Sequence, residues 1–323
     1  MTTNAAMLPT NETLADPMGP DNNDNMGSRV RRGLSGRGAS VAAILIAIVW
    51  TLPTFGLFVT SFRPVQDINS TGWWTTFPIH VRGWYHFSWH WPSTTFQNYT
   101  DVLFGASTSS GRLASYAINS LVITIPAVIL PVAIASFAAY ALAWGHFKGR
   151  DWVYIGIFAL QIVPLQMALI PLLQVFTSTH TPVFMRVWLA HTCFALPVGV
   201  FLLHNFMSEL PREVFEAARV DGAGHAQIFR KIVLPLIVPA LASLAIFQFL
   251  WVWNDLLVAL VFSDGTEKSA PITQRLAGLA GTRGNDWQRL TSGAFVSIVI
   301  PLIVFLGLQR YFVRGLLAGS VKG

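Results

Sequence analysis

The stretch EVFEAARVDGAGHAQIFRKIVLP, residues 213–235, is a polar and basic segment between two long apolar runs. Its first half favours a short helix, because alanine is a strong helix former and acidic groups such as Glu216 suit the positive end of a helix dipole. Gly222 and Gly224 then break this helix, since glycine can reverse the chain without strain. The amphipathic pattern over 226–232 predicts a second short helix that ends before the next apolar run. We expect two small helices at a glycine elbow on a membrane face, where a partner can bind.

The composition around this segment is that of a membrane protein. The chain is 53% hydrophobic and only 11% charged, which is too apolar for a soluble domain of its length. The formal net charge is +6, but the basic residues lie in short clusters beside apolar runs, as membrane anchors do, so nucleic acid is not predicted as a partner. The one cysteine, Cys193, falls inside an apolar run, and we interpret it as a packing residue.

Six apolar runs are long enough to cross a bilayer, which requires roughly 20 residues. We predict spans at about 40–62, 115–143, 152–176, 187–207, 235–262 and 291–313. Six spans place both ends on one side, and the loops on that side carry more Lys and Arg than the others, which indicates the cytoplasm. The sequence therefore predicts an all-α, multi-pass integral membrane protein of the inner cell membrane, with both ends and the 213–235 segment cytoplasmic.

The predicted organisation has three parts. Residues 1–38 form a disordered cytoplasmic tail that ends in a basic cluster, because a segment rich in Asn, Thr, Asp and Pro buries too little apolar surface to order itself. Residues 39–314 form the six-helix transmembrane domain, which contains the cytoplasmic loop at 208–234. Residues 315–323 form a short cytoplasmic tail.

The first outer loop, 63–112, is long and rich in tryptophan. Such tryptophans anchor proteins at the headgroup level, and contact with an extracellular partner is the alternative. His86 and His90 stand four residues apart, but no carboxylate or cysteine completes a ligand set, so no metal site is predicted.

The sequence has no phosphate-binding G-x-x-x-x-G-K-[ST] loop, no H-E-x-x-H and no G-x-S-x-G. The chain alone is therefore not predicted to be an enzyme, and energy for uphill transport must come from another subunit or from an ion. Asp255 lies in an apolar run, where a carboxylate serves as a proton relay, a structural pair or a cavity-lining group. Polar residues in spans either line a path or tie helices together, and the candidate translocation-path residues are Asn119, Gln248, Asn254 and Asp255.

The residues of the central segment resemble the EAA loop of ABC-transporter permease subunits. The match consists of Glu216-Ala217-Ala218, Gly222 after three residues, Ile232 after nine more, and Leu234-Pro235. In that family the loop is the coupling helix, which sits in a cleft of the ATP-hydrolysing subunit. The resemblance implies that Glu216 pairs with a basic group of the ATPase, that Gly222 forms the elbow and that the alanines allow close approach. Asp221, Ile232, Leu234 and Pro235 complete the implied coupling set.

The resemblance extends over about 40–323 to the carbohydrate-uptake permeases related to the smaller maltose-transporter permease, and the chain is most similar to alpha-glucoside permeases. It implies a type I ABC importer with four kinds of partner: a second, different permease, two ATPase subunits, an extracellular solute-binding protein and membrane lipid. ATP and Mg²⁺ would bind to the ATPase, and this chain would hold no cofactor. The carboxyl tail would insert between the ATPase subunits through Gly319, Val321 and Lys322, and the outer loop at 263–290 would reach into the binding protein.

The predicted function is ATP-driven import of a sugar such as maltose, trehalose or sucrose. Three alternatives stay open: a permease for another solute such as glycerol phosphate, an ion-driven carrier that uses Asp255, and a scaffold without transport activity.

Overall fold

The computed structural model describes residues 37–76, 79–81, 87–89, 93–105, 112–280 and 286–318. The chain divides into two compact units, Met1–Phe55 and Gly56–Gly323, and the packing below is that of the second. Five helices of the described residues are long and apolar enough to cross a membrane, and there are six such segments if one bent pair of helices counts as a single span. Helices dominate the described residues, and a small antiparallel hairpin, β1 (Ile79–Val81) with β2 (Phe87–Trp89), adds to the predicted all-α fold.

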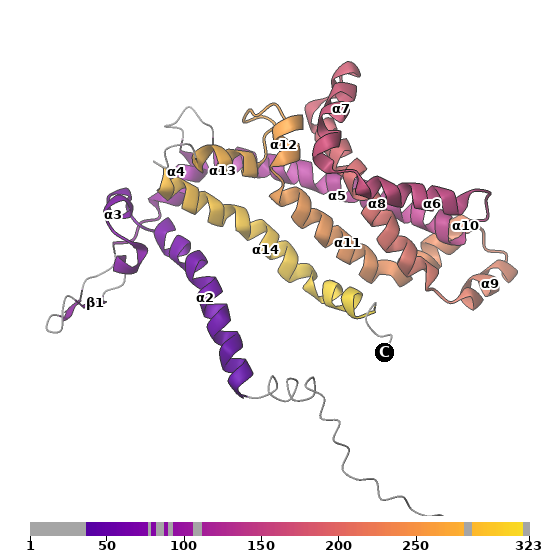
Figure 1. Cartoon of the computed structure of the whole chain (residues 1–323), viewed down its shortest axis with the longest axis horizontal. Coiled ribbons are helices and arrows are strands. Elements are labelled where there is room, and N and C mark those ends of the chain that lie inside the picture. The colour runs from indigo at the N-terminus through magenta and orange to yellow at the C-terminus, as the bar shows by residue number, and fades with distance from the viewer. Residues whose placement is uncertain are drawn as a thin grey trace, which may run out of the picture. The chain divides into compact units, whose positions relative to one another are not determined.

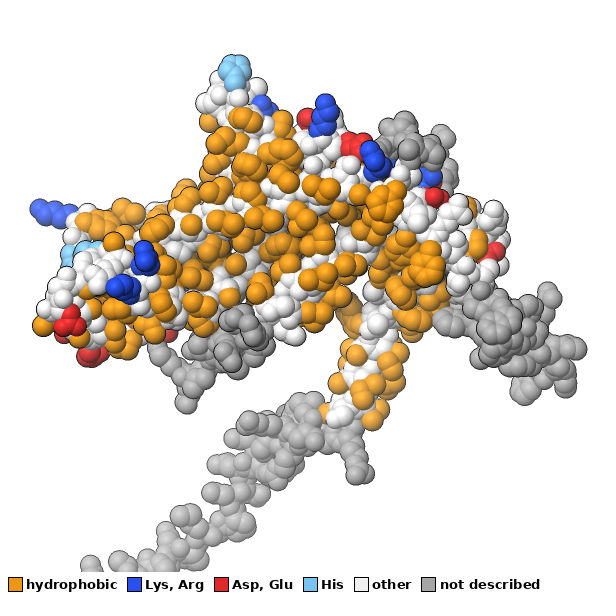
Figure 2. Space-filling model, turned by 180° about the vertical axis from the view of Figure 1, so that it is seen from behind, with side chains coloured by type: hydrophobic (Ala, Val, Ile, Leu, Met, Phe, Trp, Pro, Cys, Tyr) orange, Lys and Arg blue, Asp and Glu red, His pale blue; other side chains and the backbone are white. Residues whose placement is uncertain are grey.

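Long helices form the body of the second unit (Figure 1). They are α5 (Leu113–Trp144), α8 (Val183–Ser208), α11 (Leu234–Asn254) and α14 (Trp287–Ala318), and α5 packs most extensively against α8. Small residues allow this approach: a Cβ on Gly199 would lie 3.1 Å from the Cβ of Ala135, which is fully buried. Side chains of Ile, Leu, Val and Phe cover the outer face, as expected for a surface in contact with lipid (Figure 2).

The third predicted span is bent. Helix α6 (Arg150–Ala159) and the 3-10 turn η2 (Leu160–Ile162) meet α7 (Leu165–Ser178) at 103°. The break lies at Val163-Pro164, where proline disfavours helical backbone in the preceding residue, and Val163 is extended. The predicted span at 152–176 therefore consists of two helices joined at a bend.

The fifth predicted span ends early. Helix α11 stops at Asn254, Asp255 is extended, and the short helix α12 (Leu257–Phe262) follows. The first span is α2 (Arg37–Ser61), the fourth is α8 and the sixth is α14. These three helices agree with the predicted runs to within a few residues at most ends, although α14 extends to Ala318.

Hydrogen bonds of buried side chains fix the start of the long outer loop that follows α2. It contains α3 (Val65–Ser70), the 3-10 turn η1 (Trp73–Thr76), the hairpin and α4 (Gln97–Phe104). Arg63 is 3% exposed and donates to the carbonyl oxygens of Thr71 at 3.1 Å and Asp67 at 3.0 Å. Asn98 donates to the carbonyl oxygens of Ser61 and Arg63, each at 2.9 Å. His86, His90, Trp84 and Trp91 lie outside the described residues.

Two groups of short elements lie at opposite ends of the long helices (Figure 1). The elements α4 and α13 (Ile272–Ala280) lie at one end, and α9 (Arg212–Val220) and α10 (His225–Ile228) lie at the other. The segment that the sequence singles out is therefore at one end of the bundle, where α5 and α8 end and α6 begins.

Candidate functional site: the α9–α10 elbow

Helix α9 is held to the bundle by one large side chain. Phe215 is 1% exposed and stacks on Trp144 at the end of α5, with ring centroids 3.7 Å apart and an interplanar angle of 13°. The Trp144 indole N–H donates to the carbonyl oxygen of Met207 at 3.0 Å, which fixes the ring at the end of α8. Phe215 is thus the anchor of α9, and the sequence alone did not identify it.

The rest of α9 faces outward. Glu216 and Ala217 are exposed, Ala218 is half-buried, and Val220 is 87% exposed. Within the described residues, no ion pair involves Glu216. An exposed carboxylate beside small side chains and an exposed valine is the arrangement of a surface that can receive a partner. The structure therefore presents the predicted coupling residues Glu216 and Ala217 on an accessible helix face.

The elbow after α9 is closed by a glycine cap. Gly222 has a φ of 79°, its N–H donates to the Arg219 carbonyl oxygen at 3.0 Å, and the Ala223 N–H donates to the Ala218 carbonyl oxygen at 2.9 Å. These bonds form a Schellman motif, which satisfies two carbonyl groups at the helix end. Gly224 has φ −75° and ψ 165°, an extended conformation open to any residue. The prediction of a glycine reversal is therefore confirmed at Gly222 and wrong at Gly224.

The second short helix does not end where the sequence predicted. Helix α10 continues through a π-helical turn, η3 (Phe229–Val233), directly into α11. The wider turn lies just before Pro235, which has no backbone N–H to donate. Ile232 and Leu234 are half-buried, and Pro235 is exposed. These three members of the predicted coupling set join the elbow to α11 rather than lying on the α9 surface.

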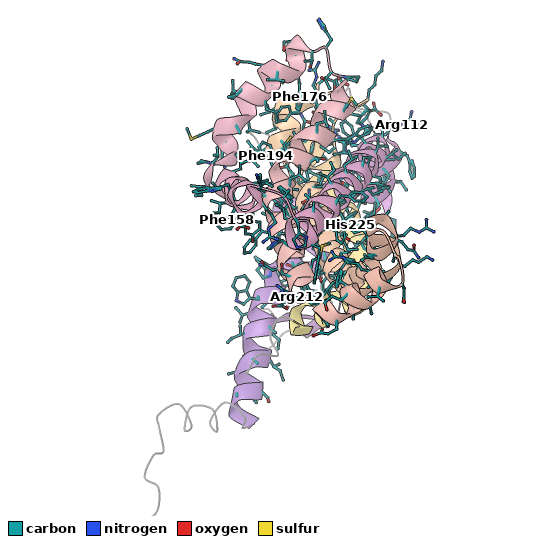
Figure 3. All side chains as sticks on the ribbon, turned by 90° about the vertical axis from the view of Figure 1, so that its right-hand side faces the viewer. Arg112, Phe158, Phe176, Phe194, Arg212 and His225 are labelled. Carbon is teal, nitrogen blue, oxygen red and sulfur yellow. The ribbon has the colours of Figure 1, made fainter. Side chains whose placement is uncertain are left out.

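Aromatic contacts fix α10 against α5. The Tyr140 hydroxyl lies 3.1 Å from His225 Nδ1, and the Phe229 ring lies 5.0 Å from the Phe137 ring and 5.1 Å from the Tyr140 ring. Ile228 and Val233, on the same segment, are 1% and 0% exposed. The elbow is therefore packed against α5 and continuous with α11. Figure 3 views the bundle from this end and labels Arg212 and His225.

Two candidate path residues tie parts of the chain together. The Asn119 amide, 9% exposed, donates to the carbonyl oxygens of Glu267 at 2.8 Å and Ala270 at 3.1 Å. The Gln248 amide, 3% exposed, donates to the Ala127 carbonyl oxygen at 3.3 Å. The geometry of this chain favours a structural tie over a path for both residues. Gln248 joins α11 to α5, whereas Asn119 joins α5 to the outer loop between α12 and α13.

Asp255 has a structural role between α11 and α12. Its Oδ2 accepts the N–H groups of Val258 at 3.0 Å and Ala259 at 3.2 Å, so it caps the start of α12. His191 on α8 places Nε2 at 3.9 Å from the same oxygen. Asn254 is exposed and donates to the Leu250 carbonyl oxygen of its own helix. Nothing in the sequence indicated that His191 and Asp255 lie close together.

The four candidate path residues do not line the cavity at the α6–α7 bend. This cavity of about 650 Å³ has mainly apolar walls, which include Cys193 and Trp251. The tail residues Gly319, Val321 and Lys322 lie outside the described part of the chain, so their predicted contact with the ATPase stays a prediction. No group of three His, Cys, Asp or Glu side chains suited to a metal ion occurs among the described residues.

The outer loop between α12 and α13 is internally braced. Asp264 accepts hydrogen bonds from the Ser269 hydroxyl, the Thr266 hydroxyl and the Thr266 N–H, and Gly265 has a φ of 71°. The Ser269 hydrogen bond, with the bonds from Thr266, holds the pKa of the Asp264 carboxyl below its usual value. Together with the Asn119 bonds, this network holds the loop that the sequence placed near the binding protein.

The comparisons with known proteins agree with this arrangement. The model of the family described as binding-protein-dependent transport system inner membrane component matches residues 102–317. An osmoprotective compounds uptake permease of Synechocystis is 52% identical over 285 residues, which cover 87% of this chain and 91% of that protein. An alpha-glucoside transport system permease of Rhizobium meliloti is 52% identical over 238 residues, 72% of this chain and 61% of that protein.

A solved bacterial ABC transporter involved in the import of the polysaccharide alginate has the same fold. One of its chains superposes with a TM-score of 0.67 and 20% identity, covering 89% of this chain and 98% of that one. The family match spans all helices from α5 to α14, including the α9–α10 elbow. The chain therefore belongs to the inner membrane components of binding-protein-dependent transport systems, the permease subunits of ABC importers, and is not itself the ATPase.

Proposed function

We propose that this chain is the permease subunit of an ATP-driven sugar importer whose substrate is an alpha-glucoside such as maltose, trehalose or sucrose. Support for the substrate class comes from the alpha-glucoside permease at 52% identity, of whose length this chain spans 61%. The permease for osmoprotective compounds, also 52% identical, adds such compounds to the substrates worth testing.

The observation that carries the coupling role is the outward face of α9. Phe215 anchors the helix while Glu216 is exposed and has no ion-pair partner among the described residues. In the proposal, the carboxylate pairs with a basic group of the ATPase, and closure of the ATPase dimer moves the elbow. A partner shifts the permease between conformations only through its differential affinity for them. Because α10 runs directly into α11, motion of the elbow reaches a membrane-crossing helix without a flexible joint.

The proposed assembly contains this chain, a second and different permease, two ATPase subunits and an extracellular solute-binding protein, with ATP and Mg²⁺ on the ATPase. Both ends of this chain lie in the cytoplasm, and Gly319, Val321 and Lys322 contact the ATPase pair. Support for the orientation comes from the excess of Lys and Arg on that side.

The experiment is sugar-stimulated ATP hydrolysis by the assembled transporter in lipid. Maltose, trehalose, sucrose and glycerol phosphate are compared, each with the binding protein, and one alpha-glucoside is expected to stimulate hydrolysis above the others. Glu216→Gln is expected to reduce stimulation strongly, while Glu213→Gln, on the same helix and also exposed, is the matched control. Equal rates of sugar-stimulated ATP hydrolysis in the two variants would argue against the role of Glu216. Stimulation by glycerol phosphate alone would show that glycerol phosphate, and not an alpha-glucoside, is the substrate.

The ion-driven alternative has its own test. Because Asp255 caps α12, Asp255→Asn keeps an oxygen that can accept the same N–H groups, and transport is expected to persist. Uptake is measured in vesicles with and without a proton gradient. Gradient-driven uptake that Asp255→Asn abolishes would support the ion-driven carrier instead.

A further inference from the structure

A cavity of about 350 Å³ lies beside α9, between the end of α5, the start of α6 and the end of α8. Its polar lining comes from four segments: His146 in the α5–α6 loop, Arg150 on α6, His204 and Ser208 on α8, and Arg212, Glu216 and Arg219 on α9. Three arginines face one carboxylate, so the lining is electropositive. The coupling proposal uses Glu216 alone and leaves these basic groups without a role.

The arginines are largely free of internal partners. Arg212 and Arg219 are exposed, and no ion pair involves either among the described residues. Arg150 contacts Asp151 through Nε at 3.2 Å, in an exposed pair, and donates a long hydrogen bond of 3.4 Å to the Gly145 carbonyl oxygen. Surface pairs of this kind contribute little stability, so a stronger anion can compete for the Arg150 guanidinium.

The basic groups of this lining suit an anion. An anion with several acceptor oxygens would pair with the guanidinium groups of Arg212, Arg219 and Arg150 together.

The cavity also lies at the ends of two helices that are long and apolar enough to cross a membrane, which is where lipid headgroups begin. It opens where these helices, α5 and α8, end and where α6 begins. Beside it, Trp152 is 79% exposed and Phe147 is 47% exposed, and aromatic side chains of this kind are typical of the membrane interface. Basic pockets between helices at this level bind anionic lipid headgroups. We propose that the cavity binds the phosphate of an anionic phospholipid, whose acyl chains lie against the neighbouring apolar surface.

The proposal is tested on the full-length chain in detergent, by thermal unfolding and by native mass spectrometry with added phosphatidylglycerol or phosphatidylcholine. Arg212→Gln combined with Arg219→Gln is expected to weaken phosphatidylglycerol binding about tenfold or more, which corresponds to about 1.4 kcal/mol. The matched control is Arg230→Gln with Lys231→Gln, which removes the same charge from exposed positions outside the cavity lining. The control is expected to bind as the parent chain does.

Several outcomes would overturn the proposal. Equal weakening in both double variants would mean that general surface charge attracts the lipid. Equal stabilisation by inorganic phosphate and phosphatidylglycerol would identify a free anion as the ligand. Loss of the phosphatidylglycerol effect in the transporter assembled with its ATPase would assign the cavity to the protein partner. If the arginine variants fail to fold, Ser208→Asp, which adds a negative charge at the cavity wall, is expected to give the same loss of binding.

Discussion

Replacement of Gly222 by valine tests whether the shape of the elbow matters. Gly222 has a φ of 79°, and a Cβ built there meets no atom within 4 Å. The substitution therefore adds backbone strain without a steric clash. A left-handed conformation costs an L-residue roughly 1–2 kcal/mol, and a β-branched residue is at the upper end of that range. A cost of this size lowers the population of the closed elbow by a factor of about 5–30.

The assay is hydrogen exchange of the two amides that close the cap. The N–H groups of residues 222 and 223 donate to carbonyl oxygens of α9, so their exchange is expected to accelerate about 5–30-fold in Gly222→Val. Gly222→Asn is expected to accelerate exchange less, because asparagine tolerates the left-handed conformation. In the assembled transporter, Gly222→Val is expected to insert normally into the membrane and to uncouple ATP hydrolysis from uptake.

Gly224→Val is the matched control. Gly224 is two residues away, equally open, and extended with φ −75°, so valine fits there and exchange should not change. If the two valine variants behave alike, or if Gly222→Val exchanges as the parent does, the strain argument is refuted.

Three further predictions concern α9 and the outer loop. Phe215→Ala removes the stack on Trp144 and should destabilise the docking of α9 by about 3–5 kcal/mol, which is measured as faster hydrogen exchange along α9. Val214→Ala, at an exposed position, should change the stability of this docking by no more than about 0.5 kcal/mol. Asn119→Leu removes the amide that donates to the carbonyl oxygens of Glu267 and Ala270, which should cost about 1–3 kcal/mol. Proteolysis of the 263–271 segment should then accelerate, and an unchanged cleavage rate would argue against this structural role of Asn119. Hydrogen bonds lower the pKa of the Asp264 carboxyl. The ionised carboxylate therefore stabilises the loop above about pH 4, the ordinary pKa of an aspartate, and this stabilisation is lost as the pH falls through the lowered pKa. Hydrogen exchange of the loop measured against pH should show this loss, and the pH dependence should disappear in Asp264→Asn.

The sequence by itself determined which segments cross the membrane and where the elbow lies. Apolar runs of sufficient length predict spans because the bilayer requires every backbone polar group to be bonded within the helix. The position of Gly222 was equally readable, because a helix that ends in the left-handed conformation favours glycine. These are local requirements, set by residues close in the chain.

Tertiary structure decided the features that depend on distant neighbours. The anchoring of Phe215 requires Trp144, which the fold brings in from another helix, and His191 on α8 lies 3.9 Å from Asp255 at the α11–α12 break. Hydropathy could not locate the bend at Val163-Pro164 or the end of α11 at Asn254, because both sides of each break are apolar. The sequence of Asn119 and Gln248 is the same whether these side chains face a path or bond to another part of the chain. Only their partner carbonyl groups, more than 100 residues away along the chain, distinguish a structural tie from a path residue. The physical reason is that a hydrogen bond depends on distance in space and not on separation along the chain.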